Sequence, residues 1–188
     1  MEMGKHTPTI QAVYLIGLKR LLGSDHLMRS LHLEKRTGGS APSFAELARS
    51  LEAGTDPLAA KGLSLMAGRE AFDMLLRSQG EEMGLLNAEI RMLPLRRRIV
   101  RGMSALIRWM NGLWGLKSDL KDQNQVLTVS LQDAHDSFDD GTFQAAAIFM
   151  GGLIQGMLSW LSGGKYFPVQ FEPGGSGMEI IVSRNPID

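Results

Sequence analysis

The sequence contains no cysteine among its 188 residues. Disulfides, thiolate metal sites and a cysteine nucleophile are therefore excluded. The 20 basic residues balance the 20 acidic ones, so no net charge points to nucleic acid or to an anionic membrane as partner. The dinucleotide fingerprint and the P-loop are also missing, which leaves no recognisable nucleotide site. The lack of cysteine fits a reducing compartment, and we expect a cytoplasmic protein.

Histidine is scarce, and none of its four positions forms an i, i+4 pair: these are His6, His26, His32 and His135. His135 stands in the acidic segment 133–141, the one cluster with metal-capable atoms. That segment lacks the glycine and the terminal glutamate of a calcium-binding loop. We therefore expect no bound metal, no cofactor and no catalytic residue.

The stretch Phe143–Leu161 organises the rest of the chain. Its helical wheel has a broad apolar face, while the opposite face holds small residues that include Gly152 and Gly156. Glycine costs about 0.8–1 kcal/mol relative to alanine inside a helix, so something must approach this backbone closely. A strand, a second subunit or a flat ligand are the alternatives. The stretch is short for a membrane span and carries Gln155, which favours a buried helix.

Helices are predicted before this stretch. One spans Ile10–Leu22, another follows the capping box of Ser43 and Glu46, and a third spans Leu63–Gly80. Gly54-Thr55-Asp56-Pro57 is interpreted as the end of the second. A last helix in the segment 96–114 turns Ile99, Met103, Leu106 and Met110 inward and Arg97, Arg101 and Arg108 outward. We interpret its arginines as a solvated face rather than a phosphate-binding patch.

After Gly112 the hydrophobic period changes to two, which indicates strands. We predict them at 114–119, 125–132, 166–172 and 178–183, with a turn at 120–124. The fold class is thus α+β, with N-terminal helices followed by a β-β-α-β-β unit and a mostly antiparallel sheet. We expect a single domain over 1–188, with a helical part at 10–110 and the ββαββ part at 112–186.

A family resemblance covers the C-terminal third. The segment GLIQGMLSWLSGGKYFPVQFE, from Gly152 to Glu172, and the strand MEIIV resemble the 4-vinyl reductase, or hydrocarbon-binding, domain. Weaker matches upstream are AGREAF and LPLRRRI. The resemblance implies a fold shared with small subunits of the TRAPP vesicle-tethering complex, an apolar cavity and a homodimer. The family's cysteines are absent here, so a zinc or thiolate role does not follow.

Three functions are consistent with these patterns. The first is a non-catalytic binding or sensory module for a small hydrophobic molecule, acting as a homodimer. The second is an enzyme that acts on a tetrapyrrole or other hydrophobic substrate with an external reductant. The third is a structural dimerisation or assembly protein that uses the small-residue face of Phe143–Leu161.

The predicted pocket lies between Phe143–Leu161 and the arginine-bearing helix, since both turn methionine-rich stripes inward. The alternative is that these stripes close on one another as ordinary core. The predicted ligand-binding residues are Met103, Leu106, Trp109, Met110, Met150, Leu153 and Met157.

Overall fold

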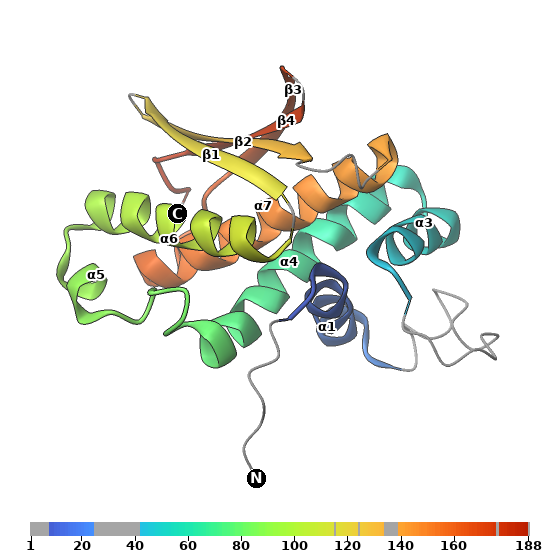
Figure 1. Ribbon diagram of the computed structural model, residues 1–188, viewed down its shortest axis with the longest axis horizontal. Helices are drawn as coiled ribbons and strands as arrows, with labels where there is room; N and C mark the ends of the chain where they lie inside the picture. The colour runs from blue at the N-terminus through green and yellow to red at the C-terminus, as the bar shows by residue number, and fades with distance from the viewer. Residues whose placement is uncertain are drawn as a thin grey trace, which may run out of the picture.

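The protein was analysed as a computed structural model, which describes residues 8–24, 42–114, 116–123, 125–133, 139–175 and 177–187. The four histidines and the apolar segment 27–33 lie outside these ranges. Figure 1 shows the elements in chain order. They are α1 (Ile10–Leu22), α3 (Phe44–Gly54), α4 (Pro57–Gln79), α5 (Ala88–Met92), α6 (Leu95–Leu113), β1 (Leu116–Gln123), β2 (Val126–Asp133), α7 (Asp140–Ser162), β3 (Val169–Gly174) and β4 (Gly177–Ser183).

The four strands form one sheet in the order β1-β2-β4-β3, and every neighbouring pair is antiparallel. The predicted α+β class and the β-β-α-β-β order are therefore confirmed. The turn predicted at 120–124 is wrong, because β1 continues to Gln123. Leu120 pairs with Val129 and is half-buried, while the polar residues that follow it tolerate solvent on an edge strand.

Helix α7 runs without interruption through the middle of the molecule, between the sheet and α4 (Figure 1). Its first turn is capped by the Asp139 carboxylate, which accepts a hydrogen bond from the Thr142 amide at 2.8 Å. Its last turn ends at Gly163 in the left-handed conformation. Although α7 is long and apolar enough to cross a membrane, 78% of its most apolar window is buried inside the fold. Within this structure, α7 is a core helix.

Helix α4 covers the small-residue face of α7. A Cβ at Gly152 would lie 2.0 Å from the Leu65 carbonyl oxygen, and one at Gly68 would lie 2.2 Å from the Phe149 carbonyl oxygen. The two backbones thus touch where both helices carry glycine. The sequence suggested a strand, a second subunit or a flat ligand over this backbone. At Gly152 the neighbour is instead a helix, α4. The strand alternative holds only for Gly151, where a Cβ would lie 2.5 Å from the Phe171 ring of β3.

The start of α4 corrects a second prediction. Asp56 is not the end of the preceding helix but the N-cap of α4, accepting hydrogen bonds from the Leu58 and Ala59 amides at 3.0 Å each. Pro57 then occupies the first helical position, where its missing N–H costs nothing. The capping box of Ser43 and Glu46 is present as predicted.

Candidate ligand-binding site

The seven predicted ligand-binding residues lie on α6 and α7, which pack side by side (Figure 1). Six are fully buried and Trp109 is 8% exposed, and all seven belong to the hydrophobic core. The helices approach closely at Gly102, where a Cβ would lie 2.5 Å from the Leu161 side chain and 3.5 Å from the Met157 sulfur. The seam between α6 and α7 is therefore tightly packed at its Met157 end. That these seven residues bind a ligand stays a prediction.

A row of aromatic rings continues from α6 to the opposite side of α7. Trp109 meets Trp114 edge to face at 5.5 Å, Trp114 lies 6.4 Å from Phe149 of α7, and Phe149 meets Tyr14 of α1 edge to face at 5.0 Å. The Trp114 indole donates a hydrogen bond to the Pro8 carbonyl at 3.3 Å. These contacts join helices that are distant in sequence, which makes the seam one wall of a larger aromatic core.

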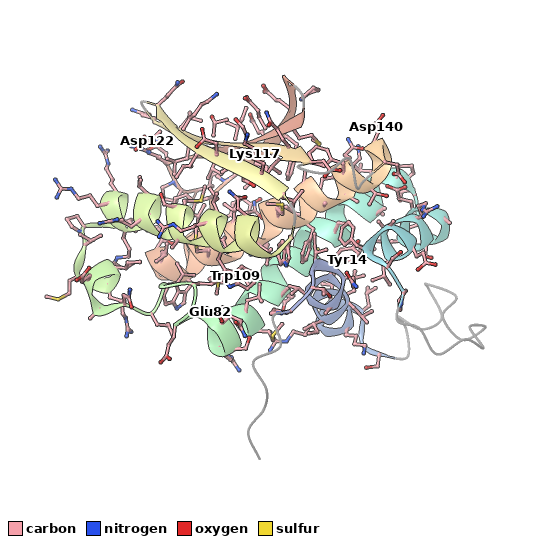
Figure 2. The ribbon with its side chains drawn as sticks, viewed as in Figure 1. Tyr14, Glu82, Trp109, Lys117, Asp122 and Asp140 are labelled. Atoms are coloured by element: carbon pink, nitrogen blue, oxygen red, sulfur yellow. The ribbon has the colours of Figure 1, made fainter. Side chains whose placement is uncertain are left out.

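The indole nitrogen of Trp109 is buried and has no hydrogen-bond acceptor among the residues that the structure describes. Figure 2 shows Trp109 beneath α6, on the side turned away from the sheet. A buried donor left without a partner costs about 1–3 kcal/mol. Trp109 thus holds one unpaired donor inside a largely apolar core.

A polar pair is buried on the α1 side of the same core. The hydroxyls of Tyr14 and Ser64 lie 2.8 Å apart, and burial raises the pKa of Tyr14 to about 12. A cavity of about 10 Å³ adjoins Ser64, which is the size of one water molecule. The sequence had no signal for this contact, because its two partners are 50 residues apart.

The acidic segment 133–141 has one structural role that can be described. Asp139 caps α7, and the backbone hydrogen bond from Thr142 lowers the pKa of its carboxyl group. His135 lies outside the described residues. Within the described ranges, no three metal-ligating side chains come together. The absence of a bound metal stays a prediction.

The α+β fold of this chain is shared with solved structures of H-NOX domains. No family model and no curated protein sequence matches the chain. Among solved structures, a single-residue mutant of T. tengcongensis H-NOX is 12% identical, with a TM-score of 0.59 and coverage of 95% of this chain and 97% of that one. The Fe(II) unliganded H-NOX protein from K. algicida is 13% identical, with a TM-score of 0.57 and coverage of 93% and 96%.

An oxygen-binding H-NOX domain related to soluble guanylate cyclases, in its oxygen complex, is 12% identical. Its TM-score is 0.57, and the alignment covers 94% of each chain. At these identities the likeness shows the fold alone. It nevertheless overturns the resemblance to the 4-vinyl reductase domain, because the structural neighbours are H-NOX domains. The Gly152–Glu172 pattern describes a glycine-bearing helix packed beside a strand, and H-NOX-like architecture satisfies the same pattern.

Proposed function

We infer that the chain is a non-catalytic binding or sensory module for a small hydrophobic molecule. Its support is an H-NOX-like fold, since H-NOX neighbours include an oxygen-binding domain. The methionine-rich seam between α6 and α7 supplies an adaptable apolar wall. The observation that carries the proposal is the unpartnered Trp109 indole N–H. A ligand with an apolar body and one acceptor atom would satisfy this donor at little desolvation cost.

Haem is not the ligand that the described residues favour. One of the neighbouring structures concerns haem redox potential and porphyrin distortion. Haem iron takes histidine, cysteine, methionine or tyrosine as axial ligand. The chain has no cysteine, and its histidines lie outside the described ranges. The Tyr14 hydroxyl is engaged with Ser64 and its pKa is raised, which opposes a tyrosinate ligand.

The methionines at the seam do not offer haem an open side either. Met103, Met110, Met150 and Met157 are fully buried in the hydrophobic core. A flat macrocycle between α6 and α7 would have to displace the contact at Gly102. The described donor set and packing therefore do not fit haem, and the proposed ligand is smaller.

The other candidate functions have lost their support. The tetrapyrrole-reducing enzyme was suggested through the 4-vinyl reductase resemblance, which the structural neighbours contradict. Assembly through the small-residue face of α7 is blocked, because α4 covers Gly152 and Gly156. The homodimer also rested on that resemblance and has no independent support. One domain over 1–188 and a cytoplasmic location stay predictions.

The test uses isothermal titration with acetophenone, a small neutral molecule that combines one apolar ring with a single carbonyl acceptor. Trp109→Phe removes the N–H and keeps an aromatic ring, so we expect probe affinity to fall about fivefold to tenfold, as for loss of one hydrogen bond. Met157→Trp adds bulk where the seam is already closely packed, so it is expected to abolish binding. Met66→Trp, at a half-exposed position of α4, is the matched control.

Thermal unfolding separates a cavity from plain core. In a packed core, Met157→Trp costs about 1–3 kcal/mol by overpacking. A large loss of melting temperature in Met157→Trp, together with unchanged acetophenone binding, would show that the seam is not the site. Mass spectrometry of freshly purified protein would then identify any molecule that copurifies.

A further inference from the structure

A groove of about 240 Å³ lies on the outer side of α6, against the turn and short helix that precede it. Its α6 wall contains Arg101, Ser104 and Arg108, and Asn87 and Glu89 come from the opposite wall. This volume is somewhat below the roughly 300–1,000 Å³ of typical ligand pockets, so a compact ligand suits it. The groove is separate from the seam between α6 and α7.

The charges in this groove favour an anion. Arg101 and Arg108 are exposed, and neither guanidinium has an ion pair or hydrogen bond within the described part of the chain. They are seven residues apart on one helix, which puts both on the same face about 10 Å apart with Ser104 between them. The Glu89 carboxylate offsets one of these positive charges. The net excess of one charge suits a ligand with a single anionic head.

The remaining surface of the groove is apolar. Met83 and Ile90 are almost completely buried, and Leu93 and Ala105 are half-buried beside them. Asn87 precedes α5, yet its side chain makes no capping hydrogen bond, so its amide is available to the groove. A forked guanidinium binds carboxylates and phosphates in two-point fashion. The arrangement of two guanidiniums above an apolar floor is amphipathic.

We propose that this groove binds a small amphipathic anion, with a carboxylate or phosphate head at Arg101 and Arg108 and a short apolar tail on Met83 and Ile90. The sequence interpretation of these arginines as a solvated face covers Arg97, which lies on the same stripe but outside the groove. Replacing Arg97 therefore tests whether binding depends on the groove or only on positive charge along α6.

The experiment is isothermal titration of the full chain with octanoate, with octanol and acetate as probes that lack the head or the tail. We expect octanoate to bind at least tenfold more tightly than either. The double variant Arg101→Ala/Arg108→Ala should lose at least tenfold in octanoate affinity, whereas Arg97→Ala should stay within twofold of the wild type. Glu89→Gln should bind octanoate more tightly, because a repelling carboxylate is removed. Circular dichroism checks that each variant is folded.

Three results would overturn the proposal. Equal losses in Arg97→Ala and in the double variant would show attraction to positive charge without a site. Unchanged octanoate affinity in the folded double variant would exclude the groove. Sedimentation with vesicles of anionic phospholipid that depends on Arg97 as strongly as on Arg101 would make the stripe a membrane-facing surface. None of these results bears on acetophenone binding at the α6–α7 seam.

Discussion

At the scale of single residues, glycine decides how closely α4 and α7 approach. Gly152 sits where a Cβ would meet a backbone carbonyl, an atom that cannot move aside as a flexible side chain would. Gly62, on the exposed side of α4, has no atom within 4 Å of the same position. The two residues have the same helical backbone and opposite surroundings. At Gly62 only the low helix propensity of glycine matters, whereas at Gly152 the close approach of α4 also requires a residue without a Cβ.

Alanine at these two positions should therefore act in opposite directions. Gly62→Ala should stabilise the protein by up to about 1 kcal/mol, because alanine is the better helix former. Gly152→Ala should destabilise it by about 1–3 kcal/mol, since α4 and α7 must separate. Urea unfolding followed by circular dichroism measures both. If Gly152→Ala were as stable as Gly62→Ala, the close approach of these helices would be wrong.

The sequence predicted the residue that matters here but not its neighbour. The glycines of Phe143–Leu161 required a close approach, and the structure supplies one at Gly152. The element that approaches Gly152 is α4, and its approach depends on Gly68. These two glycines are some 80 residues apart, so their pairing is set by tertiary packing. Likewise, Asp56 and Pro57 are compatible both with the end of one helix and with the beginning of the next, because turns after helices and N-caps use the same residue types.

At the scale of elements, α1 is attached to α4 by a buried polar contact. Tyr14 is fully buried, and its hydroxyl has Ser64 of α4 as its partner. Because burial favours the neutral phenol, the pKa of Tyr14 is about 12, against about 10 for a free tyrosine. This contact fixes α1 at neutral pH and weakens under alkaline conditions.

The sign of the pH effect follows from linkage. The folded pKa is above the unfolded one, so the contribution of Tyr14 is fully present below about pH 10 and is lost as the pH rises toward about 12. The wild type should lose about 1.4 kcal/mol from this group by pH 11. Tyr14→Phe should start about 1 kcal/mol less stable at pH 7, because Ser64 loses its partner, and should lack this alkaline loss.

Urea unfolding between about pH 8 and 11 measures the two curves, which should converge near the upper limit. Ser64→Ala is the control, because it removes the hydrogen bond but leaves the phenol buried, so its alkaline loss should persist. Parallel curves for the wild type and Tyr14→Phe would mean that Tyr14 titrates as it does in the unfolded chain.

At the scale of the whole molecule, the fold is that of H-NOX domains, but the interior is packed differently from what a bound haem would need. The fold covers more than nine-tenths of the H-NOX structures that it matches. The interior, however, is closed by the row of rings from Trp109 to Tyr14 and by α4 on α7. The fold class was predictable from hydrophobic periods. The aromatic row was not, because its members come from separate segments and meet only in the folded protein.

This difference predicts the behaviour of the protein toward haem. Expression with a haem precursor, followed by purification, should yield protein without a stoichiometric Soret band, whereas an H-NOX domain prepared in parallel should show one. The described core has no histidine or cysteine to hold iron, and its rings are already packed. About one tightly held haem per chain, lost on replacing one of the four histidines, would contradict the prediction.

The position of α7 also has a consequence for the order of events during synthesis. The helix that covers α4 begins only at Asp140, so α3 and α4 leave the ribosome well before the element on which they pack. At roughly 5–20 residues per second, the interval between the end of α4 and the end of α7 lasts several seconds. During that time the face of α4 around Gly68, which α7 later covers, is exposed to solvent. A nascent chain of this protein should therefore engage holding chaperones until its last third emerges.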